Sequence, residues 1–460
     1  MERPETRYAK TSDGVHIAFQ EFGHGDVDLL LIPGHYTNVD AHWDIPGIAD
    51  LLQRLASFTR VILMDRRGVG LSDRLGPGST APLESDIDDV LAVLDAVHAG
   101  TTAVVASENA TPLAVSLAAI HPGRVQALAL YAPLPAPFAV ATAGWAEIPE
   151  AERALIYPAE KWLDRLDREW GNGWARADFE MFAPSFAGDA AAIASWGRYL
   201  RSAASPGSAM AHTERWLVTD IREVYPAVQA PTLVLYRPDA RPSYVMRRLV
   251  QEARRSIPDA RIVELGGRDL HWWFGDHEEL TGELEAFLTG TRRSRPATSD
   301  RVLTSVLFTD IVGSTERQAA LGDQAWKELV TGHHAIVRRA LTTWRGVEND
   351  TAGDGFYATF DGPARAIRCA QQIVGEVGTL GIEVRAGIHT GECEVIEHKC
   401  AGITVSIGAR IAGRAGPSEV LISKTVKDLV AGSGLVFDDA GEHELKGVPD
   451  RWQLFRVIEA

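Results

Sequence analysis

Short apolar runs alternate with amphipathic stretches along the first half of the chain. The runs cover residues 29–32, 61–64, 103–105, 127–130 and 232–236, and they are rich in leucine, valine and alanine. Continuous apolar runs of this length, separated by helix-length segments, are typical of parallel strands that are buried on both faces. The pattern predicts an α/β domain with a doubly wound sheet.

The strand pattern stops between residues 133 and 225, where large apolar side chains recur at helical spacing. They are Trp162, Leu163, Leu166 and Trp170, and then Ile193, Trp196 and Leu200. This spacing predicts a helical cap over about residues 134–227. An amphipathic stretch over residues 277–288 is followed by the polar segment GTRRSRPATSD. We therefore predict a first domain over residues 1–290, a linker over 291–300 and a second domain over 301–460.

Two carboxylates of the second domain follow strand-like segments. The segment VLTSVLFTD ends at Asp310 and turns directly into a helix. The segment GVENDTAGDGFYATF predicts a hairpin with Asp354 at its tip. A helix start can bind phosphate oxygens through free N–H groups, while carboxylates beside it hold a metal ion. The two acids can therefore share one site.

The amino-acid composition and net charge disfavour some classes of binding partner. The 460 residues are 45% apolar, which is enough to bury two cores. The 62 acidic and 46 basic side chains give a net charge of -16, which disfavours binding to nucleic acid or to an anionic membrane surface. There is neither a signal segment nor an apolar run of the roughly 20 residues that a membrane span needs. We therefore expect a cytoplasmic protein without a membrane span.

The chain has three cysteines, and all of them lie in the second domain. Cys369, Cys393 and Cys400 show no CxxC spacing and have no partnering histidine cluster. Such an arrangement indicates neither a zinc site nor a disulfide framework. We expect free thiols.

The first domain resembles the α/β-hydrolase family over nearly all of residues 10–290. The segments LLLIPGHYTN, VILMDRRGVGLSD and APTLVLYRPDARP carry the resemblance in that order. The resemblance implies an α/β-hydrolase fold whose nucleophile sits in a G-x-S-x-G elbow. The corresponding segment, VVASENATPLA, places Glu108 at the serine position and alanines at both glycine positions. Sliding the match by one residue would make Ser107 the nucleophile, but Val105 and Asn109 would then replace the glycines.

The sequence also shows no regular base and acid for a catalytic triad. The segment GRDLHWWFGD puts Leu270 where the family has its base and His271 one residue late, and Asp239 is the candidate acid. We therefore expect little acyl-transfer activity. The rim of the sheet would carry Glu108, His35, Asp239 and His271 beneath the cap, as a pocket for a small apolar ligand. An equally good interpretation is that Glu108 caps a helix and that His271 is an ordinary core or surface residue.

The second domain resembles the class III adenylyl and guanylyl cyclases over nearly all of residues 301–460. Five motifs agree in order: FTDIVGST, AGDGF, EVRAGIHTGE, ITVSIGARIAG and HELKGVP. The resemblance implies an α+β ferredoxin-like βαββαβ core and a homodimer with active sites at its two-fold interface. It also implies a nucleoside triphosphate substrate and two Mg²⁺ or Mn²⁺ ions per site.

The family's site residues are carried over motif by motif. Asp310 and Asp354 match the aspartates that bind the two metal ions, and Ile311 would add a backbone carbonyl. Arg410 matches the arginine that stabilises the transition state, and Lys446 matches the lysine that holds the terminal phosphates. The alternative, in which these are turn acids and surface cations, is disfavoured because all of the motifs occur together.

This chain departs from the family pattern at three positions. Ser406 replaces the asparagine that orients the ribose, and its shorter side chain predicts a slower enzyme. The two base-reading positions hold Asp350 and Lys399, which is the reverse of the polarity in ATP enzymes. This pair suits guanine at least as well as adenine, although the two side chains could instead form an ion pair that reads no base.

The resulting prediction is a metal-dependent nucleotidyl cyclase with a hydrolase-like regulatory domain. ATP is favoured because it is the commoner substrate in the family. The alternatives are a guanylyl cyclase, a bifunctional esterase-cyclase, and an inactive cyclase scaffold used for dimerisation. The presence of both metal-binding aspartates disfavours the inactive scaffold.

Overall fold

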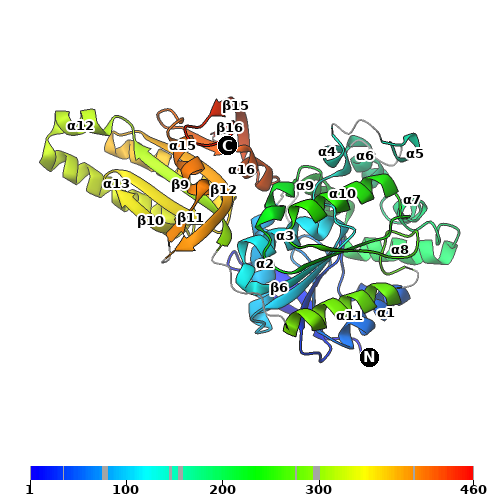
Figure 1. Ribbon diagram of the computed structural model, residues 1–460. Helices are drawn as coiled ribbons and strands as arrows, with labels where there is room; N and C mark the ends of the chain where they lie inside the picture. The colour runs from blue at the N-terminus through cyan, green and yellow to red at the C-terminus, as the bar shows by residue number, and fades with distance from the viewer. Residues whose placement is uncertain are drawn as a thin grey trace. The chain divides into compact units, whose positions relative to one another are not determined.

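The protein folds into two compact units, each with its own sheet. The computed structural model describes residues 2–34, 36–74, 81–143, 148–153, 159–274, 277–293, 301–396 and 399–458. The units are Met1–Thr298 and Ser299–Ala460 (Figure 1). Helix α11 (Glu278–Arg293) extends three residues into the predicted linker, and residues 294–300 lie outside the described residues.

The first unit contains the α/β sheet that the apolar runs predict. Its strand order is β1-β2-β4-β3-β5-β6-β7-β8. The five predicted strands are confirmed as β3 (Asp28–Ile32), β4 (Arg60–Met64), β5 (Thr102–Ser107), β6 (Val125–Tyr131) and β7 (Thr232–Tyr236). These five strands run parallel to one another. The sequence prediction missed β1 (Arg7–Lys10), β2 (His16–Phe22) and β8 (Arg261–Glu264) at the two edges.

Helices cover both faces of this sheet. Helices α1 (Pro46–Ala56) and α11 lie on one face, and α2 (Leu83–Ala96), α3 (Thr111–Ile120) and α10 (Ser243–Ser256) lie on the other (Figure 1). Helix α3 is apolar on almost every side and nearly all of its residues are buried. A helix of this kind belongs in the interior, and here it follows β5 at the centre of the sheet. Short 3-10 turns at Ala41–Asp44, Glu108–Ala110 and Pro122–Arg124 connect these elements.

The segment between β6 and β7 is helical, within the range predicted for the cap. It contains α4 (Phe138–Ala141), α5 (Glu150–Arg153), α6 (Ala159–Glu169), α7 (Asn172–Phe182), α8 (Ala190–Ala203) and α9 (Pro206–Trp216), followed by the 3-10 helix Arg222–Ala227. The side chain of Asp189 accepts hydrogen bonds from the first-turn N–H groups of α8. Ile193, Trp196 and Leu200 bury the inner face of that helix, as their spacing predicts.

The second unit has the strand and helix order of the predicted βαββαβ core. The sheet order is β10-β11-β9-β12-β14-β16-β15, and β13 pairs with β12. The strands are β9 (Arg301–Ile311), β10 (Val347–Ala352), β11 (Gly355–Phe360), β12 (Val384–Ile396), β13 (Lys399–Ala401), β14 (Val420–Ser423), β15 (Val436–Glu444) and β16 (Arg451–Ile458). The helices are α12 (Ser314–Leu321), α13 (Asp323–Thr343), α14 (Pro363–Val377), α15 (Ile403–Ala412) and α16 (Lys424–Leu429), with a 3-10 turn at Gly378–Leu380. The α/β class of the chain is confirmed.

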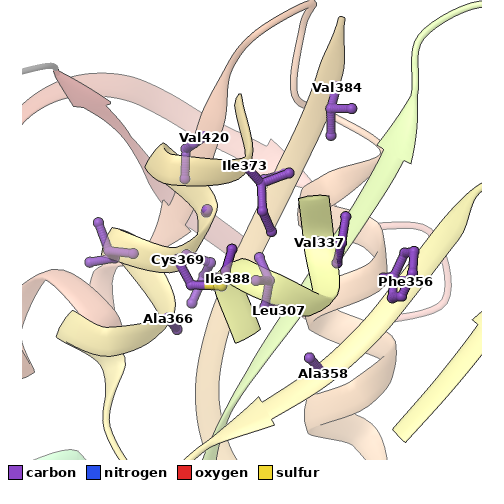
Figure 2. Packing of buried hydrophobic residues seen from close by; sticks show 14 of the residues in the cluster. Leu307, Val337, Phe356, Ala358, Ala366, Cys369, Ile373, Val384, Ile388 and Val420 are labelled. Carbon is purple, nitrogen blue, oxygen red and sulfur yellow. The ribbon is translucent and has the colours of Figure 1, made fainter. Parts of the chain in front are cut away.

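The two faces of the second sheet are packed differently. On one face, α13 and α14 bury Val337, Cys369 and Ile373 against Leu307 and other apolar residues of the strands (Figure 2). Successive side chains of a strand point to opposite faces, so Val306, Phe308 and Asp310 all point to the other face. Helix α15 lies on that face at close range, because a Cβ at Gly408 would lie 2.5 Å from the side chain of Val306.

No helix in the described ranges combines the length and the apolar character that crossing a bilayer requires.

Candidate functional site

The structure brings Asp310 and Asp354 together at one end of the second sheet. Asp310 is the penultimate residue of β9, and Asp354 lies in the turn between β10 and β11. Because β11 pairs with β9, this turn reaches the end of β9. The Asp354 Oδ2 atom accepts a hydrogen bond from the backbone N–H of Ile311 at 3.1 Å. Two carboxylates from segments 44 residues apart (354 − 310) therefore face one site.

This pair of acids suits a divalent cation. Burial raises the pKa of Asp354, and the negative charge of Asp310 raises it further. A cation bound between the two carboxylates would relieve that repulsion, and hard oxygen ligands are those that Mg²⁺ and Mn²⁺ prefer. The Ile311 side chain is buried in the core, which fixes its backbone beside the Asp354 carboxylate. The residues present therefore fit the metal site that the resemblance implies.

Arg385 also belongs to this site, and sequence reasoning missed it. It lies opposite Asp310 on β12. Its guanidinium donates to Asp310 Oδ2 from Nε at 3.1 Å and from Nη2 as well. The residue stands in the motif EVRAGIHTGE, but only the register of β12 against β9 shows that it reaches Asp310.

Arg410, Ser406 and Lys446 form a second group. Ser406 and Arg410 are exposed one turn apart on α15. The Arg410 Nε atom donates to the backbone oxygen of Lys446 at 3.1 Å, which places the guanidinium beside the Lys446 backbone. Within the parts of the chain that the structure describes, no hydrogen bond or ion pair joins this group to Asp310 or Asp354. In a single chain, the predicted site residues thus fall into an acidic group and a basic group.

The two predicted base-reading positions lie on strands that are not paired in the described sheet but are joined by a side-chain contact. Asp350 is exposed on β10, and Lys399 is the first residue of β13. The backbone N–H of Cys400 donates to Asn349 Oδ1 at 3.2 Å, which joins the two strands at these positions. The Lys399 backbone is described, but its side chain is outside the described part of the structure.

In the first unit, Glu108 occupies the tip of the strand-to-helix turn. It directly follows β5 and has φ +50°, a left-handed conformation that side chains rarely adopt. The backbone is therefore strained at the position that the elbow match assigns to the nucleophile. Ser107 is fully buried, and its Oγ accepts a hydrogen bond from the backbone N–H of Gly34 at 2.8 Å.

His271 contacts Glu108, so the prediction that the histidine lies out of position is wrong. The Nδ1 atom lies 3.4 Å from Glu108 Oε1, and Nε2 lies 2.9 Å from Asp178 Oδ2. The additional residue in the loop, Leu270, turns into the cavity beneath the cap and donates its N–H to the oxygen of Phe182. Burial lowers the pKa of His271, but Asp178 and Glu108 outweigh burial and raise it to about 10. The imidazole is therefore a buried cation between two carboxylates.

Asp239 does not reach this histidine, so its prediction as the triad acid is wrong. Its side chain is 78% exposed and lies 3.4 Å from Arg247 on the surface. The carboxylate that contacts Nε2 of His271 is instead that of Asp178, on the cap helix α7. No motif marks Asp178, because it lies in the cap and not in a strand of the sheet. His35, the remaining predicted pocket residue, lies outside the described residues.

A cavity of about 80 Å³ lies beneath the cap and reaches the elbow. Its lining includes Tyr36, Trp174, Phe182 and Trp216 and the charged residues Arg66, Glu108, Asp178 and Arg215. Neither Ser107 nor Asp239 is among the described lining residues. The space where a hydrolase binds its substrate thus persists, with a carboxylate at the nucleophile position.

Comparisons with known proteins agree with both halves of this description. The family model of the alpha/beta hydrolase family matches residues 29–283, and that of the adenylate and guanylate cyclase catalytic domain matches residues 297–458. An uncharacterized protein of Rhizobium meliloti is 28% identical over 180 residues, which are 34% of this chain and 17% of that protein. A pH-sensitive adenylate cyclase of Mycobacterium tuberculosis is 28% identical over 182 residues, 38% of this chain and 45% of that protein. The chain thus spans less than half the length of these relatives.

Among solved structures, a hydrolase from Pseudomonas aeruginosa is similar to the first unit. The match covers 63% of this chain and 98% of that chain, with 21% identity and a TM-score of 0.48.

Proposed function

This chain belongs to the alpha/beta hydrolase family and carries a nucleotidyl cyclase domain, and we propose that it converts ATP into 3′,5′-cyclic AMP and pyrophosphate in a metal-dependent reaction. The observation that carries the proposal is the seating of Asp354 on the backbone N–H of Ile311, beside Asp310. A turn acid without a ligand role would have no need to approach a second carboxylate, since that approach is electrostatically unfavourable.

We assign the acidic group to the metal ions. Asp310 and Asp354 would hold two Mg²⁺ or Mn²⁺ ions through carboxylate oxygens, and Ile311 would contribute its backbone carbonyl. When bound, such ions lower the pKa of the ribose 3′-hydroxyl and neutralise charge that develops on the α-phosphate. Arg385 neutralises part of the charge on Asp310 and would reorient when the metal ions bind.

We assign the basic group to the triphosphate. Lys446 would hold the terminal phosphates, and Arg410 would stabilise the additional charge of the transition state. Ser406, one turn before Arg410, would orient the ribose with a shorter reach than the family's asparagine. The separation of the acidic and basic groups within one chain supports a homodimer in which each active site takes one group from each protomer.

GTP is the second candidate substrate, and one observation favours it. Asp350 offers a carboxylate acceptor at the first base-reading position, on β10, whose Asn349 side chain contacts the backbone of β13 beside Lys399. Guanine presents two donors to such an acceptor, whereas adenine presents the N1 acceptor to it. We retain ATP as the main proposal because a relative is named as an adenylate cyclase.

We propose that the first unit binds a ligand and regulates the cyclase. The elbow bears Glu108, which cannot act as a hydroxyl nucleophile, and the Ser107 hydroxyl is buried against Gly34. The cavity beneath the cap nevertheless remains open to a small molecule. These features support binding without hydrolysis and argue against a bifunctional esterase.

The test is the formation of cyclic product by the purified full-length chain. ATP and GTP would each be supplied with Mn²⁺, and cyclic nucleotide and pyrophosphate would be quantified. We expect equimolar products from the wild-type chain and none from Asp310→Asn or Asp354→Asn, while the control Asp438→Asn, an exposed acid on β15, keeps wild-type activity. Absence of product from both nucleotides, or undiminished activity in either aspartate variant, would contradict the proposal.

A further inference from the structure

The cavity beneath the cap has charges of opposite sign in its wall. Arg66 and Arg215 supply two guanidinium groups, and Asp178 and Glu108 supply two carboxylates. Asp178 forms no ion pair with Arg66 or Arg215 in the described structure. The two arginines pair with a buried aspartate, and Asp178 pairs with a buried histidine. Buried charges that face a shared cavity without touching are the groups that a complementary ligand would contact.

The cationic part of the wall carries an excess positive charge. Arg66 follows β4 and Arg215 lies on α9, and both donate to the single carboxylate of Asp86, at 2.5 Å and 2.7 Å from their Nη2 atoms. Asp86 is almost fully buried and is not among the described lining residues. The Nη1 atom of Arg66 makes no hydrogen bond to any residue that the structure describes. A donor on a buried cation is therefore available to an anionic group.

His212 lines the cavity beside these arginines and is neutral. Burial lowers its pKa to about 3, and the charges of Arg215 and Arg66 act in the same direction. Its Nε2 lies 3.0 Å from the backbone oxygen of Arg67. The positive charge at this part of the wall therefore comes from the two guanidinium groups.

The anionic part of the wall offers a hydrogen-bond acceptor. Asp178 and Glu108 both contact the imidazolium of His271. The Asp178 Oδ2 atom also accepts from Trp196 Nε1 at 2.7 Å, whereas its Oδ1 makes no hydrogen bond within the described ranges of the chain. An acceptor on a buried anion is therefore available to a cationic donor.

We propose that this cavity binds a free amino acid as a zwitterion, with the carboxylate at Arg66 and Arg215 and the ammonium group at Asp178. Charge-assisted hydrogen bonds at both parts of the wall would fix the ligand, and Trp174, Phe182 and Trp216 would enclose its apolar body. A cavity of about 80 Å³ accommodates roughly six waters, which is enough for a molecule of this class. The inference rests on the proposed ligand-binding role of the first unit and names the class of its ligand.

The first experiment is a binding screen on the full-length chain. Each of the twenty proteinogenic L-amino acids is added at the same ionic strength, and the shift in melting temperature is measured. The tightest binder is then compared by calorimetry with its analogue that lacks the amino group and its analogue that lacks the carboxylate. We expect each analogue to bind at least tenfold more weakly, because one buried charge loses its partner.

Two variants separate the contributions of the two charged groups. Each analogue is described by the ratio of its Kd to the Kd of the parent amino acid. In Asp178→Asn this ratio should fall at least tenfold for the analogue without the amino group and should stay unchanged for the analogue without the carboxylate. Arg66→Gln should show the opposite pattern, and Arg124→Gln, which removes an exposed ion pair with Asp95, should behave as wild type. The ratios are used only for variants that melt cooperatively, that is, variants that fold. The comparison of the analogues on the wild-type chain does not depend on the variants.

The proposal is overturned if no amino acid binds, or if an analogue with a single charge binds as tightly as its parent. Cyclic-product formation is measured separately, without any amino acid. If the wild-type chain forms no cyclic product, the cyclase assignment is contradicted, but the result of the binding screen is not affected.

Discussion

The guanidinium of Arg385 lies against the carboxylate of Asp310, with its Nε 3.1 Å from Oδ2. The two residues are paired across β9 and β12, so the register of the sheet fixes the contact. An arginine at this place would compete with a metal ion bound by the same carboxylate, because both are cations that interact with its oxygens.

Removing this competitor should strengthen metal binding. For Arg385→Gln we expect the apparent affinity for Mn²⁺ to rise about twofold to fivefold, in line with the ~0.5–1 kcal/mol of a partly exposed ion pair. Calorimetric titration of the chain with Mn²⁺ measures the change. The matched control is Arg456→Gln on β16, which breaks an ion pair with Glu419. Unchanged or weaker binding in Arg385→Gln would show that the arginine does not compete with the metal.

The elbow can be tested by restoring a hydroxyl. Glu108→Ser would place a serine at the strained turn beside His271, whose other nitrogen contacts Asp178. Hydroxyl, imidazole and carboxylate would then follow one another as in a serine triad, with Nδ1 in place of Nε2 toward the serine, so we expect ester hydrolysis at least tenfold above that of Glu108→Ala. Labelling with a fluorophosphonate probe should occur in Glu108→Ser only. Labelling of Ser107 in the wild-type chain would contradict our interpretation of the elbow.

The buried His271 cation predicts a pH dependence of stability. Its pKa is raised to about 10 in the folded protein, from an ordinary value near 6.5, so its stabilising contribution is full below about pH 6.5 and is lost as pH rises through about 10. The melting temperature of the first unit should therefore fall between pH 7 and pH 10.

Tryptophan fluorescence can follow this unit, because nine of the 12 tryptophans precede residue 298. His271→Gln should melt at a lower temperature at pH 7 and should show a flatter pH profile. Equal slopes in the two proteins would mean that the histidine is not a cation in the folded state.

Base choice depends on Asp350 and Lys399 if their side chains contact the base. A carboxylate opposite adenine N1 is a buried acceptor–acceptor mismatch that costs on the order of 1–3 kcal/mol. The double change Asp350→Lys with Lys399→Asp should therefore shift the ATP-to-GTP ratio of kcat/KM toward ATP by about tenfold to a hundredfold. A ratio that stays constant would exclude both side chains from base recognition.

The pattern of apolar runs predicted most of the sheet of the first unit, because buried parallel strands are continuous apolar runs in the sequence. Strands β1 and β8 were missed because each has four residues and is largely exposed, and β2 was missed because its residues HIAFQEF mix polar and apolar side chains and form no continuous apolar run. The ordered motifs located Asp310 and Asp354, and the structure places these two residues at one site.

The contacts that the sequence could not show are those made across the fold. Asp178 belongs to a cap helix with no motif, and Arg385 reaches Asp310 only through strand register. Asp239 was selected from its position after β7, yet its side chain turns to the surface. A residue's place in a motif predicts its position along a strand, but which groups meet depends on how separate elements pack.

We propose that two copies of this chain build each cyclase site, with Asp310 from one protomer and Arg410 from the other. Asp310→Ala and Arg410→Ala should each be inactive alone, and the mixture should hold heterodimers with one intact site. We measure cyclic-product formation after the two purified variants have exchanged subunits, with exchange verified by differently tagged chains. We expect recovery to about a quarter of wild-type activity, since half of the dimers are mixed and each mixed dimer has one of its two sites intact. Absence of recovery despite proven exchange would contradict the proposal.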